Sequence, residues 1–91
     1  MGATLDVSCE PVDGGWHCRV EVDAGSERTR HSVRVSRADF DRWGGGGPVE
    51  ELVRRSFEFL LEREPAGSIL REFELAAIQR YFPEFDQNFR R

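Results

Sequence analysis

TLDVSCEPVDGGWHCRVEV, residues 4–22, is the stretch that decides the fold of this chain. Apolar and polar side chains alternate over residues 4–10 and again over residues 16–22. A period of two places one set on each face of a strand, so both segments are predicted to be half-buried β-strands. The dipeptide Asp13-Gly14 between them favours a two-residue type I′ turn. We therefore expect a β-hairpin.

The expected turn also fixes the register of this hairpin, because it sets Cys9 opposite Cys18 and apolar residues opposite apolar residues throughout. A third strand is predicted at about residues 28–35, where His31 and Val33 belong to the inward face. The turn before it leaves two registers open, with Cys18 beside either His31 or Val33. Both registers give a three-stranded antiparallel meander with one face in solvent.

The periodicity then changes to that of helices. Ser36 has the form of an N-cap for a short helix over residues 37–43. The four glycines Gly44–Gly47 are predicted to form a flexible hinge between the sheet half and the helical half. Apolar residues at a period of 3.6 predict a long amphipathic helix over residues 48–64, which Pro65 stops.

The C-terminal region is predicted to be helical over residues 69–82 and 84–90, with Pro83 between the two segments. A strand within Ile69–Glu74 is the main alternative. The order of three strands followed by helices indicates an α+β fold, in which the helices cover one face of the sheet. A length of 91 residues is enough for one domain only.

Composition limits the classes of function. The net charge is −4, which lowers the expectation of nucleic-acid binding because such binding depends on neutralising phosphates. No run of about 18 apolar residues is present, so no membrane-spanning helix is expected. The start of the sequence lacks the basic and apolar regions of a secretion signal. We therefore expect a cytoplasmic protein whose two cysteines are reduced, and no membrane partner.

Cys9, Cys18 and His31 belong to the same predicted sheet face, and thiol and imidazole groups are ligands that zinc prefers. Their spacing is not that of a zinc site, so we interpret the cysteines as small buried residues and expect no metal. A cross-strand disulfide fits the register but not a reducing compartment. A nucleophilic pair of Cys18 with His31 has no plausible oxyanion hole. Since no catalytic or cofactor motif occurs either, we expect no enzyme activity and no cofactor.

Arg28, Arg30 and Arg34 alternate along the third predicted strand and belong to its outward face. Such a row of guanidinium groups could bind phosphate, so these residues are the candidate anion or nucleic-acid face. Several carboxylates share this face and offset the positive charge. We therefore keep nucleic-acid binding as the alternative function and a mixed charged surface as the favoured interpretation.

Aromatic residues are concentrated at the other end of the chain, where seven of the ten lie after residue 56. Phe59 falls opposite the apolar stripe of its predicted helix, and an excess of aromatic surface is typical of interfaces. The competing interpretation is that the C-terminal helices fold over Phe59 and bury it. The candidate protein interface consists of Phe59, Tyr81, Phe82, Phe85 and Phe89.

The runs SFEFLLEREP, ILREFEL and RYFPE, within residues 56–84, resemble a family of small proteins of high-GC bacteria. This resemblance implies no activity. In layout, DGGWHCRVEV followed by PVEELVRRSFEFLLE is also similar to HicB-type antitoxin domains, in which a hairpin precedes a helix on a three-stranded sheet. That resemblance implies a binding domain, since those domains neutralise a small toxin ribonuclease. The chain departs from that layout in its glycine run and in having no evident strand after the long helix.

Together these patterns predict a small, non-catalytic protein-binding or regulatory domain. It would contact a protein partner, or a second copy of itself, through its aromatic C-terminal region.

Overall fold

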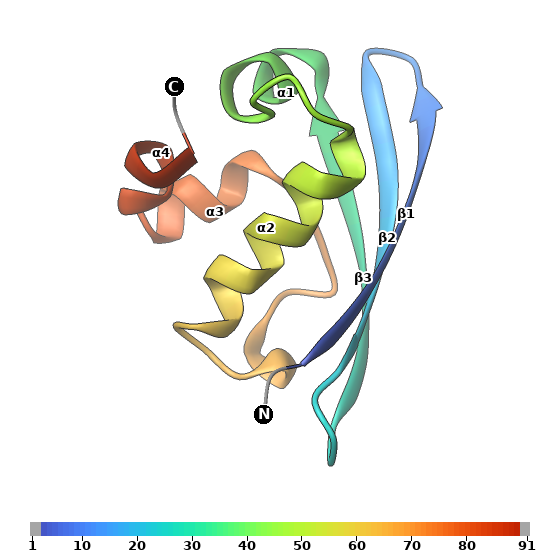
Figure 1. Cartoon of the computed structure of the whole chain (residues 1–91), viewed down its shortest axis with the longest axis vertical. Coiled ribbons are helices and arrows are strands. Elements are labelled where there is room, and N and C mark those ends of the chain that lie inside the picture. Colours follow the sequence, from blue (N-terminus) through green and yellow to red (C-terminus); the bar gives the residue numbers. More distant parts are fainter. Residues whose placement is uncertain (1–2, 90–91) are drawn as a thin grey trace.

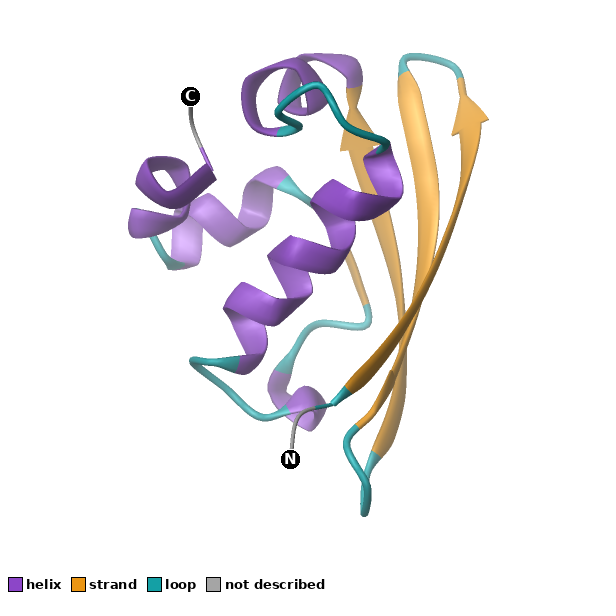
Figure 2. Ribbon diagram, viewed as in Figure 1, coloured by secondary structure: helices purple, strands orange, loops and turns teal. Residues whose placement is uncertain are grey.

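A computed structural model describes residues 3–89 and has an α+β architecture. Four strands form one sheet in the order β1-β2-β3-β4, and all the helices lie on one side of it (Figure 1, Figure 2). The opposite face of the sheet carries exposed polar side chains, among them Asp6, Arg19 and Glu21. The predicted fold class is therefore confirmed at this level, with one strand more than the sequence pattern indicated.

The three predicted strands are present as β1 (Thr4–Val12), β2 (Gly15–Asp23) and β3 (Arg28–Ser36). They form the expected antiparallel meander, and the hairpin has the predicted register, with Cys9 opposite Cys18. The turn between β2 and β3 sets the register in which Cys18 lies opposite Val33, one of the two that the sequence left open. The inner face is apolar at almost every position, which is what fixes this register.

Two glycines explain the tight first turn. Gly14 has a φ of +82°, a left-handed conformation that other residues adopt only with strain. At Gly15 the limit is space, because a Cβ atom there would meet the Val35 carbonyl oxygen and lie 2.9 Å from the Ser36 Cα. The hairpin can therefore pack closely against β3 only with glycine at this position.

The predicted helix over residues 69–82 is wrong in its first half. The chain instead forms a 3₁₀ turn, η1 (Ala66–Ser68), then β4 (Glu72–Glu74), and only then a helix, α3 (Ala76–Tyr81). β4 runs parallel to β3 and pairs with Ser32–Arg34. Those residues form the outer edge of the meander, and their free N–H and C=O groups bond to this segment, which outweighs its local helical periodicity.

The other helices follow the predictions with shorter ends. α1 (Arg37–Trp43) begins where expected, and the Ser36 hydroxyl accepts a hydrogen bond from the Asp39 N–H at 3.1 Å. α2 (Val49–Leu61) begins after Pro48 and ends before the predicted residue 64. α4 (Glu84–Phe89) matches the last predicted helix as far as residue 89, and position 90 lies outside the described residues.

The core lies between the inner sheet face and α2, and it extends outward between α2, α3 and α4. Trp43, Phe57 and Phe85 are the largest side chains in it with no exposed surface. Trp43 joins α1 to α4, because its ring packs edge-on against Phe85 and its Nε1–H donates to the Asp86 carboxylate at 2.9 Å. The glycine run closes α1 with a turn, in which the Gly44 N–H donates to the Phe40 carbonyl oxygen. Its predicted flexibility stays a prediction.

None of the helices within residues 3–89 has the length and apolar character that a bilayer crossing requires.

Candidate functional site

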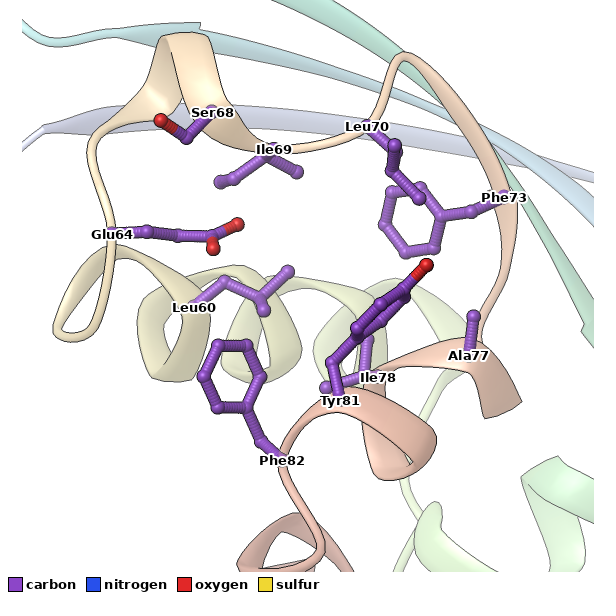
Figure 3. A pocket seen from close by; sticks show the side chains of 10 residues that line it. All are labelled: Leu60, Glu64, Ser68, Ile69, Leu70, Phe73, Ala77, Ile78, Tyr81 and Phe82. Atoms are coloured by element: carbon purple, nitrogen blue, oxygen red, sulfur yellow. The ribbon is translucent and has the colours of Figure 1, made fainter.

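An apolar groove of about 310 Å³ lies beside the C-terminal helices (Figure 3). Three segments enclose it: the end of α2, the stretch from η1 to β4, and α3. We call it the C-terminal groove. It is lined by Leu60, Glu64, Ser68, Ile69, Leu70, Phe73, Ala77, Ile78, Tyr81 and Phe82.

The floor of the C-terminal groove belongs to the core, and its rim is open to solvent. Ile69 and Ile78 are 4% and 2% exposed, so they form a fixed apolar surface. Leu70 and Tyr81, in contrast, are 50% and 68% exposed. They are two of the three large apolar or aromatic side chains in the described chain that are so open to water, and the third, Val12, lies at the hairpin. The exposed apolar surface is thus concentrated at this groove.

Three of the residues that line the groove have polar side-chain groups: Glu64, Ser68 and Tyr81. The Glu64 side chain enters from the turn after α2, and the tyrosine hydroxyl lies at the opposite side near Leu70 (Figure 3). Glu64 is half-buried, and its carboxylate has no hydrogen bond or ion pair with any of the residues 3–89. Its carboxylate is therefore available to a group from outside.

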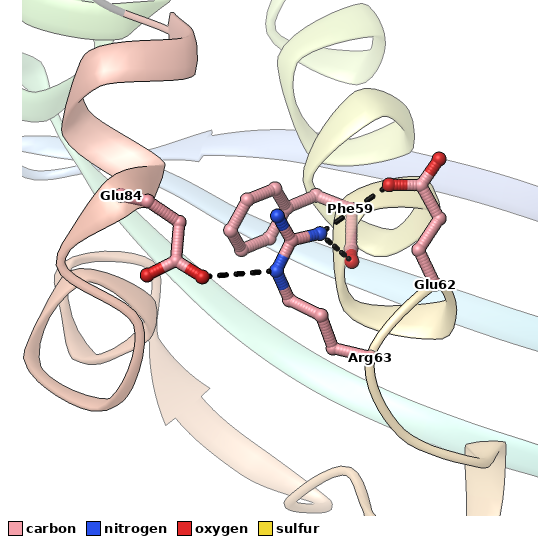
Figure 4. A network of polar contacts seen from close by, with 4 residues as sticks. All are labelled: Phe59, Glu62, Arg63 and Glu84. Atoms are coloured by element: carbon pink, nitrogen blue, oxygen red, sulfur yellow. Dashed lines mark hydrogen bonds and ion pairs between the residues drawn. The ribbon is translucent and has the colours of Figure 1, made fainter.

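A cationic clamp next to the groove holds α4 against α2 (Figure 4). The Arg63 guanidinium lies over the Phe59 ring, 3.6 Å from its centroid, and donates to the Phe59 carbonyl oxygen at 3.0 Å. It also donates to the Glu84 carboxylate at 3.2 Å, across to α4. The pKa of Glu84 is lowered, first by a hydrogen bond from its own backbone N–H and then by Arg63.

The structure separates the five predicted interface aromatics into two groups. Phe59 and Phe85 are buried, at 5% and 0% exposure, so neither ring is free to contact a partner. Phe59 packs edge-on against Phe82, Phe85 and Phe89, and the Phe85 and Phe89 rings stack with their centroids 4.3 Å apart. The C-terminal helices therefore cover Phe59, which was the competing interpretation. Tyr81 and Phe82 line the groove.

Sequence reasoning missed the other half of the groove. Leu70 and Phe73 fall in the first half of the predicted helix over residues 69–82, which does not form, and Glu64 falls in the predicted helix over residues 48–64. The signal that could have found them is the run Ile69–Glu74, for which the sequence leaves a strand as the main alternative. A strand there sends Phe73 inward to Phe57, with ring centroids 6.0 Å apart, and leaves Leu70 at the rim.

The candidate anion face, Arg28, Arg30 and Arg34, lies on the outer side of the sheet and is offset by carboxylates. Arg28 pairs with Asp23, and Arg30 with Glu21, each at 3.1 Å. Arg34 stands beside Glu74 in the β3–β4 register. All three arginines are exposed, so their pairs contribute little stability, but each carboxylate cancels charge that a phosphate would need.

The cysteines differ from expectation, since Cys9 and Cys18 are joined by a disulfide rather than reduced. Their non-hydrogen-bonded strand position brings the two Cα atoms within 4.0 Å, which is close enough for the bond. His31 is buried and lies opposite Val20 instead of Cys18. Its Nδ1 bonds to the Leu70 carbonyl oxygen and its Nε2 to the Thr29 hydroxyl. Of the two registers that the sequence left open, the one with Cys18 beside His31 is therefore not formed.

Comparison with known proteins does not assign this chain to a family. No family model matches its sequence, and no curated protein or solved structure matches it closely enough to be informative.

Proposed function

We propose that the chain is a small non-catalytic protein-binding domain that contacts its partner through the C-terminal groove. The observation that supports this is the coincidence of the groove with the exposed side chains of Leu70 and Tyr81. Apolar surface that is gathered at a concave site and rimmed by polar groups is typical of protein contacts. Tyrosine is also enriched among the residues that dominate binding energies.

The groove has the character of a docking site for a side chain. Its floor is set by core residues such as Ile78, so it needs no rearrangement to receive an apolar group. Its rim residues are exposed, so their substitution should leave the fold intact. This proposal keeps the predicted class of function and the predicted region of the chain, and it moves the contact from Phe59 and Phe85 to the groove.

The test is capture of a partner by the tagged chain from its native lysate, with a groove variant beside it. The variant Leu70→Ser/Tyr81→Ser removes the exposed rim, and Glu58→Gln serves as a control on an exposed surface outside the groove. We expect a protein retained at moderate salt by the wild type and the control, and lost from the double variant. The same purified proteins are compared by sedimentation velocity, which detects a second copy as the partner. Retention and assembly that are equal in all three proteins would overturn the proposal.

A further inference from the structure

We propose that the C-terminal groove selects a partner segment in which an apolar side chain lies next to a lysine or arginine. The apolar side chain fills the groove, and the cation pairs with the carboxylate of Glu64. This inference rests on the proposed function, since it specifies the chemistry of the partner that the groove binds.

The carboxylates around the groove differ in whether a cation of the chain pairs with them. Three glutamates lie near the clamp, and two of them, Glu62 and Glu84, are engaged by Arg63 at 3.3 and 3.2 Å. Glu64 is the one that lines the groove, and it has no such partner among the described residues. Arg63 points toward α4 and Phe59 (Figure 4). Among residues 3–89, nothing therefore compensates this negative charge beside an apolar site.

Binding of a partner over the Glu64 carboxylate has a free-energy cost that depends on the partner's own charge. A partner that closes the groove removes water from the Glu64 carboxylate, and an ionised group that loses water without a compensating bond is strongly unfavourable. A purely apolar segment would bear this cost in full. A segment with a guanidinium or ammonium group beside its apolar side chain replaces the lost water with a charge-assisted hydrogen bond. The carboxylate therefore discriminates between partners by penalising the wrong ones.

The remaining polar groups agree with a cationic occupant. The Tyr81 hydroxyl lies on the side of the groove opposite Glu64 and can accept a hydrogen bond, which is what an ammonium or guanidinium group requires (Figure 3). None of the arginines in the described part of the chain lines the groove, although Arg71 and Arg80 are exposed neighbours of its rim residues in the sequence. The chain has a net charge of −4, which favours the approach of a basic segment.

A random twelve-residue peptide library displayed on phage tests this selection. Four versions of the chain are immobilised: the wild type, Glu64→Gln, the charge-matched control Glu58→Gln, and Leu70→Ser/Tyr81→Ser. We expect the wild type and Glu58→Gln to enrich peptides with an apolar residue within about four positions of a basic one, because residues two apart share a strand face and residues three or four apart share a helix face. Glu64→Gln should enrich apolar peptides without the basic residue. Affinity of a selected peptide for Glu64→Gln should fall about fivefold, as expected for one partly exposed ion pair.

The outcomes separate the inference from the function on which it rests. If the wild type enriches apolar peptides that are lost with Leu70→Ser/Tyr81→Ser, but shows no basic preference, the inference is wrong and the proposed function stands. If the double variant enriches the same peptides as the wild type, the groove is not the docking site and both fail. Enrichment of acidic peptides by the wild type would also overturn the inference.

Discussion

The ring of His31 in β3 is tied to the backbone of Leu70 by a hydrogen bond of 2.7 Å between Nδ1 and the carbonyl oxygen. A carbonyl oxygen can only accept, so Nδ1 carries the proton and donates. Nε2 of the neutral ring then accepts from the Thr29 hydroxyl at 2.8 Å. One buried imidazole thus joins the sheet to the segment that forms the rim of the C-terminal groove.

This arrangement predicts a loss of stability in mild acid. The pKa of His31 is lowered from its ordinary value of 6.5, chiefly by burial and also by the charge of Arg71, while the bond to Leu70 opposes the shift. Below pH 6.5 the unfolded chain binds a proton at this residue that the folded chain does not. The free energy of unfolding contributed by His31 is therefore complete above pH 6.5 and decreases as the pH falls below it.

Urea unfolding at pH 8, 6.5 and 5 measures this effect in the wild type and in His31→Gln, which keeps a polar side chain that does not titrate. The wild type should lose more free energy of unfolding between pH 8 and 5 than the variant does. Asp23 and Glu84 have lowered pKa values, so their contributions are lost only in stronger acid. Equal losses in both proteins would show that His31 does not titrate on unfolding.

The clamp formed by Arg63 predicts a second effect on stability. Arg63→Ala removes the guanidinium from the Phe59 ring together with its bonds to the Phe59 carbonyl oxygen and to Glu84. We expect a loss of about 1–2 kcal/mol in the free energy of unfolding, from a cation–π contact and partly exposed hydrogen bonds. Arg80→Ala is the control, because Arg80 is exposed. A loss as small as that of the control would show that the clamp does not hold α4.

The hairpin could be predicted from the sequence because every determinant is local. The two-residue turn at Asp13-Gly14 and the alternation on either side act within a few residues of each other, and they agree on one register. The same holds for α1, whose capping residue Ser36 lies three residues before the N–H that it accepts from.

The groove could not be predicted because it depends on partners that are distant in the sequence. β4 exists because β3 offers it a free edge some forty residues earlier in the chain, and the alternation of its three residues is too short to decide between a strand and a helix. Whether Phe59 is core or surface was decided in the same way, by the return of α4 to α2. Sequence periodicity describes one element at a time, so it left that choice open.

A pair of aromatic substitutions distinguishes core from groove. Phe85 has no exposed surface, so Phe85→Ala should cost about 3–5 kcal/mol of the free energy of unfolding, as for other buried phenylalanines. Tyr81 is 68% exposed, so Tyr81→Ser should change it by about 1 kcal/mol or less. Thermal and urea unfolding measure both. If Phe85→Ala left the free energy of unfolding unchanged, Phe85 would not be a core residue and would again be a candidate for the protein interface.

The disulfide predicts a dependence on reducing agent. The Cys9–Cys18 bond closes a short loop and should stabilise the folded chain by about 2–3 kcal/mol, since it restricts the unfolded state. Dithiothreitol should lower the midpoint of urea unfolding by a corresponding amount. It should have no effect on Cys9→Ala/Cys18→Ala. Two free thiols per chain in the purified, untreated protein would contradict the bond.

The ion pairs of the β3 arginines predict weak binding of nucleic acid, which is the alternative function. Because Arg28 and Arg30 are paired with Asp23 and Glu21, little net positive charge remains on this face for a nucleic-acid backbone. We expect the wild type to elute from a column of immobilised duplex DNA or RNA at low salt, at the same position as Arg28→Ala/Arg30→Ala/Arg34→Ala. Asp23→Asn/Glu21→Gln is the informative counterpart, since it removes the compensating charges and should raise the salt needed for elution. Strong wild-type retention that falls steeply with salt, and that disappears in the triple variant, would instead make this face a nucleic-acid site and replace the groove as the centre of function.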